Sequence, residues 1–243
     1  MAEIFGRNPV LEALKSERSI NKILIAKDRQ KSFSQEILKL AKDRKIPFQI
    51  VEKSYLDKLL PQQNHQGVVA LVAAAEYVDW QDILVKAREK NEDPLIIMLD
   101  EIEDPHNLGA ILRTADGAGA HGVIIPKRRA VPLTEGVAKA SAGAVEHVPV
   151  ARVSNLAQTI ESLKKEGCWI VGTSLKGKNI YQQDLKGPLV IVIGNEGKGL
   201  SRLIEEKCDF LVNIPMRGKI QSLNASVAAG IIMYEVVRQR TTV

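Results

Sequence analysis

From residue 95 to the end of the chain, short apolar runs alternate with segments of helical spacing. Apolar strands separated by helices are typical of a mainly parallel sheet that helices cover on both faces. The pattern therefore predicts an α/β fold for residues 95–243. The apolar runs, each a predicted strand, are Leu95–Leu99, Val123–Ile125, Val145–Val150, Trp169–Gly172, Leu189–Ile193 and Phe210–Ile214.

Residues 1–75 carry a second, smaller α/β pattern. We expect this part of the chain to be a separate small domain. Helical spacing predicts helices over residues 10–17, 34–45 and 54–60, and β-rich runs predict strands over residues 22–26, 48–51 and 66–75.

Residues 76–94 are more polar than the segments on either side. We interpret them as a linker that contains one helix over residues 81–89, with Asp79 as its candidate N-cap. The sequence thus predicts a domain over residues 1–75, a linker over residues 76–94 and a larger domain over residues 95–243.

The composition, with 45% hydrophobic and 26% charged residues among 243, is that of an ordinary globular protein. No apolar run reaches the roughly 18 residues that suggest a membrane-spanning helix, so we expect no membrane partner. The first residues lack the basic and apolar regions of a signal peptide. A net charge of +5 favours an anionic partner.

The few cysteines and histidines indicate neither a disulfide framework nor a metal site. Cys168 and Cys208 lie in apolar surroundings, and we interpret them as buried reduced thiols of a cytoplasmic protein. The four histidines are scattered without metal-ligand spacing, so we expect no metal.

The first of three polar turns follows the strand predicted over residues 95–99. Asn107, just after Pro105, is the expected N-cap of the next helix. On that helix Arg113 lies one turn from Gly109 and from Gly117, which predicts a groove open to a bulky anion. Pairing of Arg113 with a nearby carboxylate such as that of Asp116 remains an alternative.

The second turn, Gly194–Gly199, follows the strand predicted over residues 189–193. It lacks the spacing of a Walker phosphate loop, and its carboxylate suits a ligand with hydroxyl or amine donors better than a polyphosphate. A plain surface turn is the alternative. Gly117–Gly122 matches G-x-G-x-x-G, but it follows a helix and precedes a strand, so we interpret it as a helix end.

The third turn, Pro215–Asn224, leads into a helix that begins with several alanines and Gly230. Ser222 and Asn224 place polar side chains at the start of that helix. The small residues indicate that another element packs closely there, and a helix of a second subunit is one such element. Because all three turns follow predicted strands, we expect them to form one composite site at the ends of neighbouring strands.

The three turns together resemble the motifs of the SpoU (TrmH-type) family of RNA ribose 2′-O-methyltransferases. The first motif is similar to Asp100–Ala115, the second to Ile193–Leu200 and the third to Asn213–Ser226, in the family's order. Phe5–Leu14 and His65–Val68 resemble the substrate-binding domain of the branch that methylates guanosine in 23S ribosomal RNA.

This resemblance implies a SPOUT-type α/β domain with a deep trefoil knot, preceded by a small RNA-binding domain. It also implies S-adenosylmethionine as cofactor and a homodimer. By motif, the catalytic positions are Asn107, Arg113, Glu196, Ser222 and Asn224. The cofactor-binding positions are Thr173, Gly194, Asn195, Glu196, Gly197, Ile214, Met216, Ser222 and Leu223.

The function implied is methylation of a guanosine ribose 2′-hydroxyl in 23S rRNA. Transfer RNA as substrate, or a non-catalytic RNA-binding or ribosome-assembly factor, are the alternatives. Basic residues are the candidate RNA contacts, because phosphate groups attract clustered cations. We select Arg7, Lys127, Arg128 and Arg129.

Overall fold

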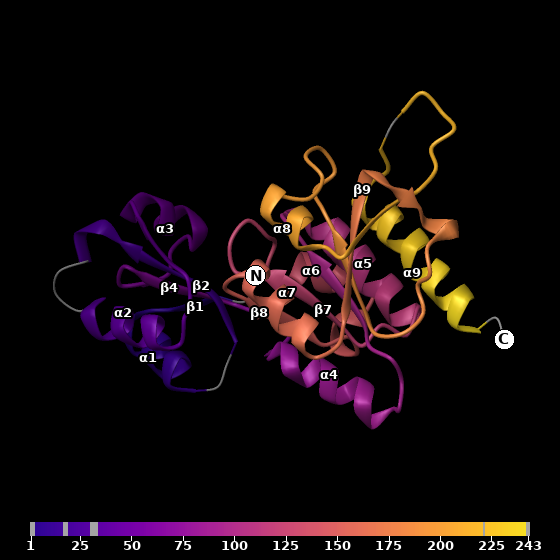
Figure 1. The fold of residues 1–243 in the computed structure, drawn as a ribbon. Coiled ribbons are helices and arrows are strands. Elements are labelled where there is room, and N and C mark those ends of the chain that lie inside the picture. The colour runs from indigo at the N-terminus through magenta and orange to yellow at the C-terminus, as the bar shows by residue number, and fades with distance from the viewer. Residues whose placement is uncertain (1–2, 17–18, 30–33, 221, 242–243) are drawn as a thin grey trace. The chain divides into compact units, whose positions relative to one another are not determined.

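The computed structural model describes residues 3–16, 19–29, 34–220 and 222–241. It divides the chain into two compact units, which are coloured along the chain in Figure 1. The first unit comprises residues 1–76 together with residues 132–135. The second comprises residues 77–131 and 136–243.

The first unit is built on a four-stranded sheet in the order β1-β4-β2-β3. Helices α1 and α2 pack their apolar side chains on one face and helix α3 packs on the other, so both faces are covered. The strands are β1 (Glu3–Phe5), β2 (Ile20–Ala26), β3 (Phe48–Val51) and β4 (Val68–Val72). The helices are α1 (Arg7–Lys15), α2 (Ser34–Asp43) and α3 (Lys53–Leu59), with a 3-10 turn over Lys27–Arg29.

The second unit contains a seven-stranded sheet in the order β11-β9-β10-β6-β7-β8-β5. Each neighbouring pair is parallel, which confirms the predicted parallel α/β fold. The strands are β5 (Tyr77–Val78), β6 (Leu95–Leu99), β7 (Gly122–Pro126), β8 (Val150–Val153), β9 (Trp169–Asn179), β10 (Leu189–Ile193) and β11 (Phe210–Asn213).

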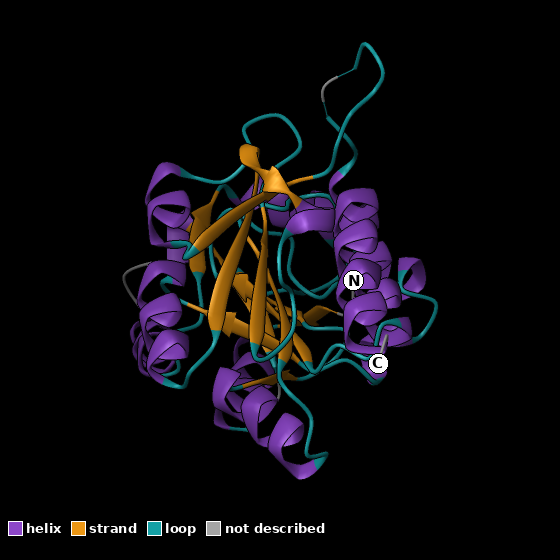
Figure 2. Cartoon of the chain, turned by 45° about the vertical axis from the view of Figure 1, so that its right-hand side comes forward, coloured by secondary structure: helices purple, strands orange, loops and turns teal. Residues whose placement is uncertain are grey.

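Helices lie on both faces of this sheet, as expected for buried parallel strands (Figure 2). Helices α4, α7 and α8 share a core with the side chains of one face, such as Met98 and Val192. Helices α5 and α9 pack against each other and contact strands β7 and β10 respectively. The helices are α4 (Trp80–Glu89), α5 (Pro105–Gly117), α6 (Glu135–Ala140), α7 (Leu156–Lys165), α8 (Arg202–Lys207) and α9 (Ala225–Thr241), with 3-10 turns over Ala144–Glu146 and Ile180–Gln182.

Two strands of the second unit differ clearly from their predicted bounds. The strand predicted over residues 145–150 is wrong, since residues 144–146 form a 3-10 turn and β8 begins only at Val150. Val145 and Val148 are buried, and buried side chains on irregular backbone give the same apolar signal as a strand. Strand β9 extends to Asn179 because its polar outer half pairs with β11.

Residues 76–94, which we expected to be a linker with one helix, carry β5 and α4. Strand β5 pairs with β8, and Ile83 and Leu84 of α4 belong to the core of the second unit. Asp79 is the N-cap of α4, and it forms a reciprocal capping box with Asp82.

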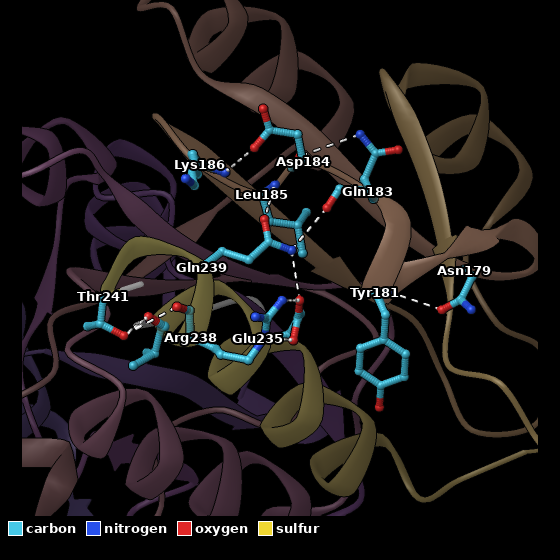
Figure 3. A network of polar contacts seen from close by, with 11 residues as sticks. Asn179, Tyr181, Gln183, Asp184, Leu185, Lys186, Glu235, Arg238, Gln239 and Thr241 are labelled. Carbon is cyan, nitrogen blue, oxygen red and sulfur yellow. Dashed lines mark hydrogen bonds and ion pairs between the residues drawn. The ribbon is translucent and has the colours of Figure 1, made fainter. Parts of the chain in front are cut away.

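The C-terminal half of α9 holds the connection between β9 and β10 (Figure 3). The side chain of Gln239 donates to the carbonyl of Gln183 (3.0 Å) and accepts from the amide of Leu185 (2.9 Å). Gln239 also donates to Glu235 (2.8 Å), whose carboxylate is paired with Arg238. The deep trefoil knot that the resemblance implies stays a prediction.

Both cysteines are free thiols. Burial raises the pKa of Cys168 to about 11 and that of Cys208 to about 12, so neither side chain is a ready nucleophile at neutral pH. Among the helices of the described chain, none is long and apolar enough to cross a membrane.

Gly109 of α5 provides a test of the packing. A Cβ at this position would lie 2.4 Å from the Cβ of Ala140 and 2.9 Å from its carbonyl carbon, so Gly109→Ala forces α5 and the end of α6 apart. We expect a loss of about 1–3 kcal/mol in the free energy of unfolding, measured by urea denaturation.

Gly230→Ala in α9 is the matched control. Its Cβ would meet only the methyl group of Thr114, at an ordinary 3.6 Å. The gain in helix propensity then stabilises the protein by about 0.5–1 kcal/mol. Equal effects of the two substitutions would contradict this description of the packing.

Candidate active site

The three polar turns follow β6, β10 and β11, at the same edge of the second unit's sheet. Strands β6 and β10 are neighbours, and β9 alone separates β10 from β11. Because parallel strands place their carboxyl ends at one edge, segments far apart in the sequence meet there. The edge is therefore a composite site, as the sequence predicted.

A chain of hydrogen bonds connects the three turns. The side-chain amide of Asn107 donates to the carboxylate of Glu196, and its oxygen accepts from the amide of Asn224 (2.9 Å). Asn107 is only 7% exposed, whereas Glu196 and Asn224 are exposed. One buried amide thus joins the first turn to the second and to the third.

Asn107 is not the N-cap of α5, so that prediction was wrong. Asp104 is the cap, and its carboxylate accepts from the amide of His106 (2.8 Å) while Pro105 occupies the first helical position. Asn107 lies within the first turn of the helix, where its side chain is available to contacts outside α5.

The second turn is a tight hairpin. Asn195 and Gly199 exchange backbone hydrogen bonds of 3.0 and 2.8 Å, and the side chain of Asn195 accepts from the amide of Gly197 (2.9 Å). A Cβ on Gly194 would lie 2.3 Å from the carbonyl carbon of Gly199, so only glycine fits there.

The third turn ends at Asn224, which caps α9. Its side-chain oxygen accepts from the amide of Ser226 (2.9 Å), and its carbonyl accepts from the amide of Ala228 (3.0 Å). The same side chain therefore begins the helix with its oxygen and contacts Asn107 with its nitrogen.

A cavity of about 560 Å³ lies at this edge. Its volume falls within the range of about 300–1,000 Å³ that is typical of small-molecule sites. The structure places around it all the residues that the motifs suggested for the cofactor: Thr173, Gly194, Asn195, Glu196, Gly197, Ile214, Met216, Ser222 and Leu223. Their role as cofactor contacts stays a prediction.

The cavity has walls of two kinds. Ile214, Met216 and Leu223 supply apolar side chains, whereas the tight hairpin begins with Gly194, where there is no room for a side chain. This combination suits a ligand with a flat apolar part and polar groups that backbone atoms can bind.

The sequence analysis missed part of the lining. Ser174 donates to Glu205 of α8 (3.1 Å), and both residues line the cavity. The outer half of β9, which the apolar pattern did not reveal, supplies Ser174. Among the described residues, no group of histidine, cysteine and acidic side chains could hold a metal ion.

Arg113 lies on the exposed surface of α5. Within the part of the chain that the structure describes, its side chain makes no hydrogen bond or ion pair, so the alternative pairing with Asp116 does not occur there. We predicted a groove between Gly109 and Gly117. The prediction was wrong on the side of Gly109, because Ala140 and Ser141 pack against this glycine and leave no open space. Arg113 does not line the cavity of this chain.

The basic residues proposed for RNA differ in their surroundings. Arg128 and Arg129 are both exposed, and Arg129 forms an ion pair with Glu101. Arg7 lies in the first unit at the start of α1, and its backbone amide donates to Gln66 (3.0 Å).

Family models match both parts of the chain. The SpoU rRNA Methylase family matches residues 94–234, which is more than half of the chain. A model described as RNA 2′-O ribose methyltransferase substrate binding matches residues 4–78. The recognition of the three motifs in the sequence is thereby confirmed at the level of the family.

The chain is also similar to known proteins over most of its length. It is 54% identical to YacO of Bacillus subtilis, whose name places it among TrmH family tRNA/rRNA methyltransferases, over 99% of this chain and 96% of that protein. A crystal structure of an AdoMet-bound rRNA methyltransferase from Sinorhizobium meliloti is 27% identical, with a TM-score of 0.60, and covers 97% of this chain and 86% of that one.

A TrmH/SpoU tRNA modifying enzyme from A. aeolicus is 36% identical, with a TM-score of 0.56, and covers 66% of this chain and 83% of that one. Family models and relatives agree on the kind of enzyme, and S-adenosylmethionine (AdoMet) is the family's cofactor. The chain belongs to the SpoU family of RNA ribose 2′-O-methyltransferases, with a substrate-binding domain followed by the methyltransferase domain.

Proposed function

We propose that this protein methylates the ribose 2′-hydroxyl of a guanosine in 23S rRNA, with S-adenosylmethionine as methyl donor. The observation that carries the proposal is the hydrogen-bonded chain from Glu196 through Asn107 to Asn224 beside a cavity of suitable size. Methyl transfer to a hydroxyl is a displacement, so positioning and electrostatics supply most of the acceleration.

We propose that the cofactor binds in this cavity. Ile214, Met216 and Leu223 would pack against its apolar surface, and backbone groups of the hairpin after Gly194 would bind its polar groups. When bound, S-adenosylmethionine supplies a methyl group activated by a positively charged sulfur.

Arg113 is proposed to hold the RNA phosphate beside the target ribose. A guanidinium has a pKa above about 12, so it is a poor base but a strong partner for phosphate. Its side chain is exposed and, within the described chain, has no carboxylate partner, so it is available to an anion. A cation there also favours loss of the proton from the 2′-hydroxyl. The alternative role of Arg113 is to accept that proton directly as the base.

The polar chain at the cavity is proposed to orient the reacting groups. Glu196 would face the ribose or Arg113, and Asn107 would hold its carboxylate in one direction. Ser222 and Asn224 would fix the segment that closes the cavity, because Ser222 lines it and Asn224 begins α9.

Two comparisons favour ribosomal RNA over transfer RNA. The Sinorhizobium meliloti rRNA methyltransferase covers nearly the whole chain, whereas the tRNA modifying enzyme covers only 66% of it. The similarity to the rRNA methyltransferase therefore extends over the substrate-binding region at residues 4–78, which favours ribosomal RNA as the substrate. The set of polar groups at the cavity disfavours a non-catalytic RNA-binding factor, the remaining alternative.

We further propose a cytoplasmic homodimer that uses α9. Val227 and Tyr234 are large apolar side chains on this helix, and they are 50% and 52% exposed. A second copy of the chain would cover them, and it would also bring another Arg113 to the assembly.

Incubation with radiolabelled S-adenosylmethionine and total RNA tests the substrate. We expect label in 23S rRNA, on a guanosine 2′-O-methyl group identified by nuclease digestion and mass spectrometry. Label in tRNA alone would replace the proposed substrate, and no label in any RNA would favour the binding factor.

Arg113→Ala should lower the rate of RNA methylation by about 100-fold or more, the usual effect of removing one preorganised charge partner. Cofactor binding, measured by calorimetry, should survive, because Arg113 does not line the cavity. Arg88→Ala is the matched control, since Arg88 of α4 is an exposed arginine paired with Glu166, at the end of α7. Equal loss of methylation and cofactor binding would make Arg113 structural.

Substitutions of Asn224 should separate helix capping from contact with Asn107. Asn224→Ser keeps a good N-cap but is too short to reach Asn107, whereas Asn224→Ala loses both and should cost about 1 kcal/mol more in the free energy of unfolding. Both variants should lose methylation to a similar extent. Full activity of Asn224→Ser would show that the contact with Asn107 has no part in the reaction.

A further inference from the structure

Asp100 is a buried acid that the proposed reaction has not used. It follows directly after β6 and is only 4% exposed. Its backbone amide continues the ladder to β10 by donating to the carbonyl of Ile193 (2.9 Å). Charged side chains are rarely so buried without a specific partner.

The partner of the Asp100 carboxylate is the backbone amide of Ser201, at 2.7 Å. Ser201 is the N-cap residue of α8 and closes the loop that begins at Gly194. A carboxylate that accepts from a backbone amide at the start of a helix makes a strong, charge-assisted contact. Asp100 therefore holds the far end of the loop that carries Glu196.

A second contact holds the near end of the same loop. The side chain of Asn195 donates to the carbonyl of Glu101 (3.1 Å). Glu101 has a left-handed backbone with φ of 60°, which is rare for a residue other than glycine. The loop is thus fixed at both ends to the adjacent residues Asp100 and Glu101.

We propose that Asp100 is a positioning residue for this reaction: through Ser201 it fixes the loop that presents Glu196 to Asn107. Asp100 does not line the cavity, so it acts through the loop and not by contact with a substrate. The inference rests on the proposed methyltransferase function. It adds a residue outside the cavity whose side-chain oxygen fixes the geometry of the loop.

The test compares kcat for RNA methylation among variants of this contact. Asp100→Ala should lower kcat by at least about 10-fold, because small displacements of reacting groups are costly. Asp100→Asn should recover most of the activity, since an amide oxygen still accepts from Ser201. Ser201→Pro keeps the carboxylate but removes the donor, and its φ of −63° suits proline; it should act like Asp100→Ala.

Glu196 distinguishes positioning from general destabilisation. If Asp100 acts through Glu196, the double variant Asp100→Ala with Glu196→Ala should be no slower than Glu196→Ala alone. Multiplied losses would overturn the proposal. Asp209→Ala is the matched control. Asp209 also accepts from a backbone amide, that of Ile170 (2.9 Å), but at the opposite end of β9 and β11. The kcat of this variant should equal that of the parent protein.

Hydrogen exchange makes the test independent of activity. Amides of residues 194–200 should exchange faster in Asp100→Ala and Ser201→Pro than in the parent protein or Asp209→Ala. If the parent protein methylates no RNA, the proposed function fails. Hydrogen exchange would still show whether the contact between Asp100 and Ser201 holds the loop. Unchanged exchange, or full activity of Ser201→Pro, would overturn the role of Asp100.

Discussion

The amide of Asn107 is the interaction on which the rest of the site depends. A primary amide has one donating and one accepting end, and here each end has a single partner, Glu196 or Asn224. Because Asn107 is buried, leaving either end unpaired would cost about 1–3 kcal/mol. The turns after β10 and β11 are therefore required to approach α5 in one arrangement.

The sheet makes this approach feasible. Parallel strands covered on both faces are apolar along their length and change to polar residues only at their ends, so the polar turns collect at one edge. Asp100 shows the transition most clearly, since it follows the apolar β6 directly and turns its carboxylate to the loop after β10. Packing of the strands and placement of the polar groups are consequences of the same topology.

Much of this was predictable from the sequence. Apolar runs located most of the parallel strands, and the motifs of the resemblance named many, though not all, of the residues that line the cavity. The errors have physical causes. Buried valines on irregular backbone imitated a strand over residues 145–150, and the polar outer half of β9 gave no apolar signal although it pairs with β11. Long-range pairing of this kind leaves little trace in local spacing.

The error at Asn107 is more instructive, because it concerned function. Both Asp104 and Asn107 are of a residue type that can cap a helix, and the sequence analysis selected Asn107, two residues after Pro105. Proline at the first helical position requires the cap to be the residue before it, which is Asp104. Since Asp104 performs the structural task, Asn107 is left inside the helix with an amide that α5 does not need. At the start of α5, the polar residue left over once Asp104 caps the helix is therefore a stronger candidate for function than the cap itself.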